Sequence, residues 1–456
     1  MRASSDVPTN PGFRCLSLQQ IQQIHKATLE VLEITGVDIY DESALALLQQ
    51  AGAYVTGIRV RFPSALVEWA ISVAPESMTI WSRDGIPTLQ LAGRNVYFGP
   101  GPTCPNILDM YTGKRRLVRR DDVEDYARLC DALPNIDFMM SMGILAEGAE
   151  TSDVQEFAAM ILNTKKPIVA WAWNEAGAQD ILDIALAFRN SLDDLRQRPN
   201  YMFYCEPTAP LQHTGEALRI LLFTAELGLP IIYGAGPVGG ASSPVTIEGM
   251  IVCGNAEVLS GLVIAQLKRK GTPFIFGSGT GPLDMASMTV AYGAPEFILG
   301  QAALSEMASF YGLPSWGFGG CSDSKLPDEQ MAIQSVLWNL FSSLSGANLV
   351  HDVGFIESGL TGSMEAIVIN DEIIGMVRSM LRGIGLSQEA LNLDATGLTD
   401  CSTSENWVAL ERTSMGWRAR QKAKALLRQS PEVLQPEHDY IQHILDRARL
   451  RIIKQN

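Results

Sequence analysis

The stretch Leu229–Gly279 contains the repeating unit that decides the fold. It begins with the short apolar run LPIIYGAG (Leu229–Gly236), continues through the helical pattern NAEVLSGLVIAQLKRKG (Asn255–Gly271) and ends in a second apolar run, TPFIFGSG (Thr272–Gly279). A short strand, then a helix that ends at glycine, then another short strand is typical of a parallel βα unit. The rest of the chain can be searched for the same pattern.

Eight such runs follow one another from Val96 onward, with helical patterns between them. They are VYFGPG (Val96–Gly101), IDFMMSMG (Ile136–Gly143), KPIVAWAW (Lys166–Trp173), NYMFYCEP (Asn200–Pro207), LPIIYGAG, TPFIFGSG, LPSWGFGG (Leu313–Gly320) and NLVHDVG (Asn348–Gly354). Eight successive βα units close a TIM barrel. An open doubly wound sheet would need a GxGxxG turn after its first strand, and FGPGPTCPN does not supply one. The sequence therefore predicts an α/β protein with a (β/α)8 TIM barrel.

The barrel is expected to occupy residues 93–385, between two shorter segments. Residues 1–92 combine two helical patterns, SLQQIQQIHKATLEVLEIT and DESALALLQQAGA, with the strand-like YVTGIRVRF and SMTIWS. We expect them to form an accessory segment packed on the barrel. Residues 386–456 include the amphipathic pattern SPEVLQPEHDYIQHILDRARLRIIK, which predicts a C-terminal helical extension.

Composition restricts the partners and the compartment. The chain has 35 Lys and Arg against 50 Asp and Glu, a formal net charge of −15, which disfavours nucleic-acid binding. Seven cysteines are scattered without a CxxC pair, as expected for reduced thiols in a cytoplasmic protein. The start MRASSDVPTNPG has no apolar region, and Asn255 and Glu257 interrupt the most apolar later run. We therefore expect neither an export signal nor a membrane span.

Aromatic side chains gather at the C-terminal ends of the expected strands, where a TIM barrel carries its active site. They are only 7% of the chain but occur at all but one of these strand ends. Ring faces hold quaternary ammonium groups without any hydrogen bond from the ligand, so the pattern favours a cation site. Strand alternation allows only part of the set to face the pocket. The candidates are Tyr97, Phe98, Trp171, Trp173, Tyr204, Tyr233, Trp316, Phe318 and Phe355.

Three polar residues at the same strand ends are candidates for chemistry. His351 and Asp352 could form a ligand pair or a hydrogen-bonded dyad, and Glu206 could balance a cation or cap a loop. No spacing demands a metal. A metal-assisted hydrolase or lyase that uses these three residues and His213 nevertheless remains an alternative.

Three motifs resemble the trimethylamine methyltransferase family over nearly the whole chain. They are FGPGPTCPNILDMYTGKRR, GFGGCSDSKLPDEQ and GANLVHDVGFIESGLTGSMEAIVINDEI. The resemblance implies a TIM-barrel enzyme that moves a methyl group from an amine to the Co(I) of a partner corrinoid protein. The family's founding members carry pyrrolysine, whereas this sequence contains only standard residues. It therefore looks like a non-pyrrolysine member that uses a quaternary amine, with glycine betaine as first choice and other betaines as further possibilities.

The resemblance also implies roles for the candidate residues. The cage around the ammonium would consist of Tyr97, Phe98, Trp171, Trp173, Trp316 and Phe355. His351 would contact the substrate carboxylate or the corrinoid, with Tyr204 or Tyr233 as a second polar contact. A flat corrin ring would approach at Gly99, Gly236, Gly279 and Gly319. No DxHxxG pattern is present, so we expect no tightly bound cofactor and a corrinoid supplied by the partner. A homo-oligomer is expected, and a betaine-binding protein without turnover is a second alternative.

Overall fold

A parallel sheet forms the core of the structure. The computed structural model describes residues 12–383, 415–428 and 435–455. Within these residues, seven strands pair in parallel in the order β6-β18-β17-β14-β12-β10-β9. They are β6 (Tyr97–Phe98), β9 (Ile168–Ala170), β10 (Tyr201–Cys205), β12 (Ile231–Ala235), β14 (Phe274–Ser278), β17 (Ser315–Phe318) and β18 (Leu349–His351). Each lies within an apolar run that the sequence predicts as a strand.

The remaining predicted strand, the run Ile136–Gly143, is second in chain order and forms only isolated parallel bridges, Met139 with Ile168 and Gly143 with Cys104. Its backbone still bonds to both neighbours. The Asp137 N–H donates to the carbonyl of Phe98 in β6 at 2.7 Å, and the Met139 N–H donates to the carbonyl of Pro167, just before β9, at 2.9 Å. The segment therefore lies between the two ends of the curled seven-stranded sheet.

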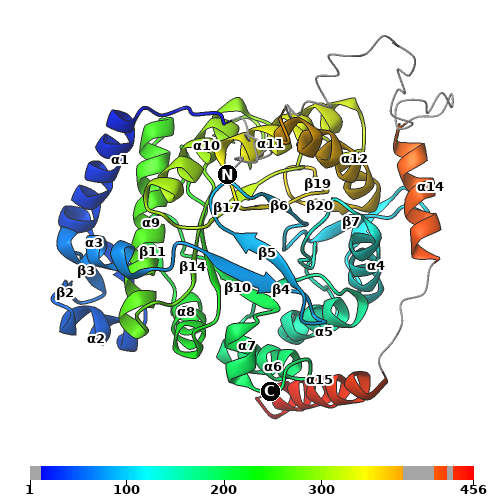
Figure 1. Cartoon of the computed structure of the whole chain (residues 1–456), viewed down its shortest axis with the longest axis horizontal. Helices are drawn as coiled ribbons and strands as arrows, with labels where there is room; N and C mark the ends of the chain where they lie inside the picture. Colours follow the sequence, from blue (N-terminus) through cyan, green and yellow to red (C-terminus); the bar gives the residue numbers. More distant parts are fainter. Residues whose placement is uncertain (1–11, 384–414, 429–434, 456) are drawn as a thin grey trace, which may run out of the picture.

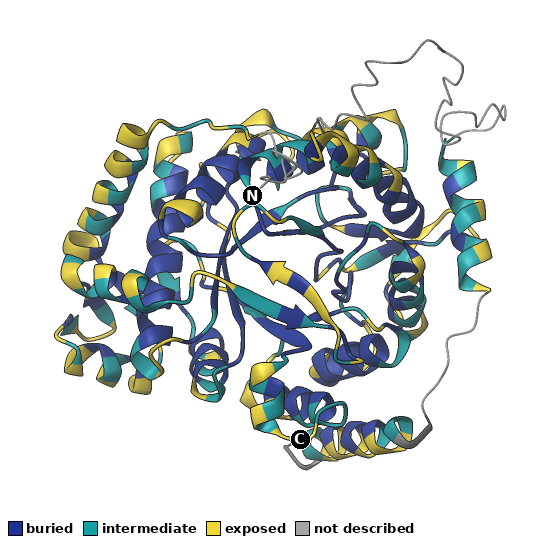
Figure 2. Cartoon of the chain, viewed as in Figure 1, coloured by how far each residue is buried: buried dark blue, intermediate teal, exposed yellow. Residues whose placement is uncertain are grey.

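Helices connect the strands and surround the sheet (Figure 1). They are α4 (Arg120–Ala132), α5 (Ser152–Asn163), α6 (Glu175–Leu186), α7 (Leu192–Gln197), α8 (Gly215–Leu227), α9 (Ile247–Lys268), α10 (Pro295–Phe310), α11 (Glu329–Ser345) and α12 (Met364–Leu381). Their buried sides face the strands and their exposed sides face solvent (Figure 2), which is the arrangement expected of α/β units.

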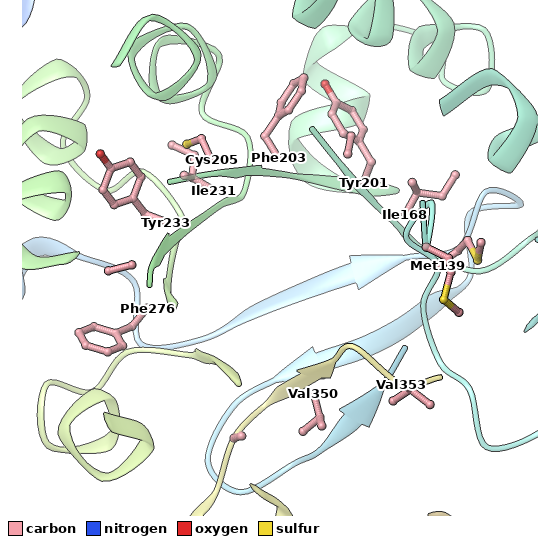
Figure 3. Packing of buried hydrophobic residues seen from close by; sticks show 14 of the residues in the cluster. Met139, Ile168, Tyr201, Phe203, Cys205, Ile231, Tyr233, Phe276, Val350 and Val353 are labelled. Carbon is pink, nitrogen blue, oxygen red and sulfur yellow. The ribbon is translucent and has the colours of Figure 1, made fainter. Parts of the chain in front are cut away.

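Strand alternation divides the core into two clusters. One contains Val169, Met202, Ile232, Ile275 and Leu349, which point into the curl of the sheet. Residues one position away belong to the other cluster, between the sheet and the helices. Figure 3 shows side chains of this outer cluster, such as those of Phe203, Tyr233 and Phe276, pointing away from the interior.

A hairpin closes the N-terminal end of the sheet. It consists of β4 (Met78–Trp81) and β5 (Pro87–Leu91), which pair antiparallel and cross the centre of the molecule in Figure 1. Ile80, Leu89 and Leu91 are fully buried in the inner cluster. The hairpin thus forms a floor, and the opposite end of the sheet is left for the loops that follow the strands.

Those loops form two small sheets, β13-β15-β16 and β19-β20-β7-β8. Their strands are β7 (Asn106–Leu108), β8 (Arg115–Leu117), β13 (Val238–Gly239), β15 (Gly281–Asp284), β16 (Thr289–Val290), β19 (Phe355–Ile356) and β20 (Thr361–Ser363). The stretch from β6 to β7 is rich in glycine and proline and is called the Gly-Pro loop below. Strand β7 pairs with β8 and with β20, which follows β18 in the chain.

The N-terminal segment packs on one side of the helices that surround the sheet (Figure 1). It contains α1 (Leu18–Glu30), the π-helical turn η1 (Val31–Thr35), β1 (Val37–Ile39), α2 (Glu42–Gln50), β2 (Tyr54–Thr56), β3 (Arg59–Arg61) and α3 (Ser64–Val73). The three helices all contact α9. Ser17 caps α1 and Asp41 caps α2 through side-chain hydrogen bonds to backbone N–H groups, as such residues do at helix starts. Strand β1 also pairs with β11 (Gln212–His213).

Two C-terminal helices are described. Helix α14 (Met415–Leu427) packs on α12 and α4, and α15 (Gln435–Gln455) packs on α6 and α5. Arg447 and Arg451 of α15 both pair with the buried carboxylate of Asp180 in α6. Residues 386–414 of the predicted extension lie outside the described residues. The boundaries 1–92, 93–385 and 386–456 stay a prediction.

Helix α9 is long and apolar enough to cross a membrane by length and composition alone, and 89% of its most apolar window is buried inside the structure. Core helices pass the same test. Its burial between the sheet and the N-terminal helices accounts for its composition.

The floor hairpin should contribute strongly to stability. We expect Leu89→Ala to lower the free energy of unfolding by about 2–5 kcal/mol, because it leaves a cavity in the inner cluster. Thr88→Ala, on the exposed side of the same strand, should change it by less than ~0.5 kcal/mol. Urea unfolding measures both, and equal effects would show that the hairpin is not part of the core.

Candidate functional site

A cavity of about 220 Å³ lies at the C-terminal ends of the central strands. Its volume is below the ~300–1,000 Å³ typical of sites for drug-sized ligands, so it suits a small molecule. Its walls come from strands β10, β12, β14, β17 and β18, from the loops that follow them, and from the loop between β6 and β7. The lining residues are Pro102, Thr103, Tyr204, Glu206, Gly234, Ala235, Gly236, Ser278, Gly279, Tyr292, Trp316, Phe318, His351, Asp352, Phe355 and Gly359.

Aromatic rings form much of the cavity wall. Trp316 and Phe318 are two residues apart on β17, so both project inward. The imidazole of His351 contacts both rings, with centroids 4.1 Å from Trp316 at an interplanar angle of 20° and 4.4 Å from Phe318. The ring of Tyr204 is 6.0 Å from that of Trp316. This stack joins the cavity to the inner cluster below it, which also contains Trp316.

Tyr292, which sequence reasoning missed, lines the cavity from the loop after β16 and meets the Phe318 ring edge-on at 6.2 Å. Its backbone N–H donates to Asp323 at 2.8 Å. Asp323 thereby ties this loop to the loop after β17. No strand-end pattern marks Tyr292, because it lies within an excursion of the chain well beyond the end of β14.

His351 is a neutral imidazole of defined tautomer. Its Nδ1 lies 2.7 Å from the carbonyl oxygen of Gly317, which can only accept, so Nδ1 carries the hydrogen. Burial lowers the pKa of His351 to about 3. The other nitrogen, Nε2, presents a lone pair and lies 3.5 Å from Oδ1 of Asp352. His351 therefore has no free N–H to offer a carboxylate.

Two carboxyl groups face or adjoin the cavity. Glu206 is open to it and accepts a 2.6 Å hydrogen bond from the hydroxyl of Tyr204. Desolvation raises the pKa of Glu206, and this hydrogen bond partly opposes the shift. Asp352 is 2% exposed, and burial raises its pKa well above the ordinary value. Within the described ranges, its Oδ1 has no hydrogen-bond partner.

The Gly-Pro loop accommodates Asp352. A Cβ at Gly101 would lie 1.8 Å from Oδ1 of Asp352 and 2.9 Å from the ring of Phe355. Only glycine leaves space for both side chains. The loop backbone at Gly101 thus lies against the protein's own carboxyl group.

Five of the nine aromatic candidates are not among the lining residues, and three of these five lie on β6 and β12. Phe98 belongs to the outer cluster and lies under the guanidinium of Arg378 at 5.6 Å. Tyr233 also points outward, and its hydroxyl is 2.5 Å from Nδ1 of His213. Tyr97 points inward but at the wrong depth, since its hydroxyl accepts a hydrogen bond from the Gln90 N–H of the floor hairpin.

Trp171 and Trp173 pack against each other, with centroids 4.8 Å apart, and are not among the lining residues. The indole of Trp171 donates to Glu156 at 2.9 Å, and that of Trp173 donates to the carbonyl of Ala149 at 2.8 Å. Both rings are therefore held by α5 and the turn before it, in a cluster beside the cavity.

The glycine candidates differ from one another. A Cβ would meet the Phe138 ring at Gly99 (2.5 Å), the Phe318 ring at Gly279 (1.9 Å) and Val350 at Gly319 (2.2 Å). These three glycines are required by internal packing. At Gly236 nothing lies within 4 Å of such a Cβ, so only there does the predicted approach face open space.

The four residues of the metal alternative do not gather. His213 is fully buried between Tyr233 and Ser260, with Nε2 2.9 Å from the serine hydroxyl, and it is not part of the cavity lining. Within the part of the chain that the structure describes, no three His, Cys, Asp or Glu side chains are grouped as metal ligands would be.

Comparisons with known proteins identify relatives. A family model described as trimethylamine methyltransferase (MTTB) matches residues 3–421. The chain is 32% identical to trimethylamine methyltransferase MttB of Desulfitobacterium hafniense (strain DSM 10664 / DCB-2), with 92% of this chain and 85% of the relative covered. It is 30% identical to a glycine betaine methyltransferase of Desulfitobacterium hafniense (strain Y51), with 84% and 81% covered.

Among solved structures, the monomethylamine methyltransferase MtmB of Methanosarcina barkeri matches with a TM-score of 0.55 and 12% identity, covering 99% of this chain and 90% of that chain. At this identity the likeness concerns the fold alone.

The state of His351 can be measured directly. We expect its ¹⁵N signals to remain those of a neutral, Nδ1-protonated imidazole from pH 8 to pH 5, because its pKa is lowered to about 3. Histidines of the unfolded chain should titrate near ~6.5. Protonation of His351 within that range would contradict the buried geometry.

Proposed function

The chain belongs to the trimethylamine methyltransferase family, and from this premise we propose that it moves a methyl group from a quaternary amine to the corrinoid of a partner protein. The observation that carries the proposal is the composition of the cavity. Five aromatic side chains and two carboxyl groups line it, and no Lys or Arg is among its described lining residues. Such walls attract an organic cation through ring faces and negative charge.

Each lining group has a role in this proposal. Tyr204, Tyr292, Trp316, Phe318 and Phe355 form the cage around the ammonium. Glu206 and Asp352 balance its charge, and a bound cation favours the ionised form of both. His351 keeps Trp316 and Phe318 in place by stacking on both rings. With its only N–H bonded to Gly317, it does not serve as the donor to a substrate carboxylate that the resemblance implied.

The proposed chemistry needs no proton donor. A quaternary ammonium leaves as a neutral tertiary amine, so displacement at its methyl carbon needs no proton transfer. The protein's task is then to orient one methyl group and keep water away from it. The rigid Gly-Pro loop and the stacked rings support this task, because they hold the walls without a mobile charged group.

The reduced corrinoid of the partner would supply the nucleophile that accepts the methyl group. Of the four glycines expected at its approach, Gly236 lines the cavity and faces open space, so we assign the approach to this side of the mouth. The chain's net charge of −15 would favour a partner with a basic docking surface.

We further propose that the sheet closes as a (β/α)8 barrel with the segment around Met139 as its second strand. Its backbone hydrogen bonds to Phe98 on one side and to Pro167 on the other support closure. A cytoplasmic location and a homo-oligomeric state remain parts of the proposal that rest on sequence.

Glycine betaine, the substrate first expected, is one quaternary amine of this kind, and a relative carries that name. A non-catalytic betaine-binding protein would retain the cage without turnover. The metal-assisted alternative has less support, because His213 lies outside the cavity.

Methyl transfer is the direct test. We expect the purified protein, mixed anaerobically with cob(I)alamin, to form methylcobalamin with at least one quaternary amine from a panel of betaines, choline and tetramethylammonium. Loss of the Co(I) absorption follows the reaction, and trimethylamine provides a tertiary comparison. Tight cation binding without transfer, even with the cognate corrinoid protein present, would favour the binding-protein alternative.

The cage can be tested separately from turnover. Phe318→Leu should weaken tetramethylammonium binding by about 0.5–2 kcal/mol, because it removes a ring face but retains an apolar side chain. The uncharged analogue of tetramethylammonium, which has carbon in place of nitrogen, should bind the variant and the parent protein equally. Equal loss for both ligands, measured by calorimetry, would show that Phe318 contributes only packing.

A further inference from the structure

The cavity lacks a cationic partner for a carboxylate. Among its described lining residues the ionisable side chains are Glu206, Asp352, His351 and two tyrosines. His351 is neutral, and its single N–H is bonded to the carbonyl of Gly317. The site therefore offers negative charge and ring faces, and the positive charge has to come from the ligand.

Of the neutral side-chain donors of the wall, one is engaged and two are buried out of reach of a ligand. The hydroxyl of Tyr204 donates to Glu206. The indole N–H of Trp316 and the hydroxyl of Ser278 have no hydrogen-bond partner in the described chain but also no accessible surface, so neither reaches a ligand unless the wall opens. Thr103 and Tyr292 retain hydroxyl groups at the wall, and these can serve an alcohol as well as an acid. A carboxylate desolvated beside Glu206 and Asp352 would gain no ion pair and would disfavour the ionised form of both groups.

The buried carboxyl group of Asp352 points to the same ligand chemistry. Its Oδ1 has no hydrogen-bond partner in the described chain, and Gly101 keeps open the space that it occupies. This oxygen has no accessible surface, so a cation in the cavity stabilises its charge through space and not by contact, whereas the carboxylate of a zwitterion opposes that charge.

We propose that the preferred substrate is a quaternary ammonium whose remaining arm carries no carboxylate, an alkyl or hydroxyalkyl group such as those of tetramethylammonium and choline. This inference rests on the proposed function and narrows its substrate class. The reaction is unchanged: one nitrogen–carbon bond breaks, its electron pair stays on the departing tertiary amine, and the methyl group passes to the reduced corrinoid.

The test compares matched substrates in one assay. Methyl transfer to cob(I)alamin is measured for tetramethylammonium, choline, glycine betaine and γ-butyrobetaine, and binding of each is measured by calorimetry. We expect kcat/KM for choline or tetramethylammonium to exceed that for either betaine by at least about tenfold, the ratio set by ~1.4 kcal/mol. A betaine that reacts equally well or better overturns this inference and leaves the proposed function intact.

Failure of methyl transfer with all four compounds counts against the proposed function, and binding then decides the inference. Choline that binds at least about tenfold more tightly than glycine betaine retains the selectivity assigned to the cavity. Equal binding, or none, overturns it.

A variant pair assigns the selectivity to the cavity charge. Glu206→Gln keeps the size of the side chain and can still bond to Tyr204, but it removes a negative charge and adds an N–H donor. We expect the preference for choline over glycine betaine to shrink by about tenfold. Glu226→Gln, on α8 and paired with Lys268, is the control and should leave the preference unchanged. Both variants should unfold at the same temperature as the parent protein. An unchanged preference in Glu206→Gln would overturn the role of this charge.

Discussion

The alternation of side chains along short parallel strands is the constraint on which the rest of the structure depends. It places Val169, Met202, Ile232, Ile275 and Leu349 in one apolar cluster inside the curled sheet, and their neighbours in the layer beneath the helices. The β4–β5 hairpin seals one end of the inner cluster. Since that end is filled by apolar side chains, the only end left for a polar cavity is the one where the strands run into loops, and Trp316 belongs to both regions.

Much of the architecture follows from the sequence, because apolar runs and intervening helices are local patterns. The depth and direction of a side chain do not follow from such local patterns. Tyr97 and Phe98 are neighbours in a two-residue strand, and the pattern VYFGPG does not reveal that one faces the floor hairpin and the other Arg378. The spacing of Trp316 and Phe318 did predict a shared face. Tyr292 could not be found from the run TPFIFGSG, since a hairpin excursion brings it back to the cavity.

The glycines also show what the sequence alone does not reveal. A glycine at a strand end can admit a ligand or a side chain of the protein itself, and the sequence does not distinguish the two. At Gly279 the space is taken by Phe318, and at Gly101 it is taken by Asp352. Only the three-dimensional contacts separate these positions from Gly236, where the space is open.

The electrostatics of the cavity follow from this packing. The ring of His351 is neutral because it is enclosed by Trp316 and Phe318, and its tautomer is fixed by Gly317. Enclosure also raises the pKa of Asp352, so in the empty site this carboxyl group lacks the hydration that would stabilise its charge, while Glu206 stays exposed at the mouth. An organic cation replaces that hydration at the point where the walls are rigid. The same groups that disfavour an anion therefore prepare the site for a cation, and binding and selectivity arise from one arrangement of buried charge.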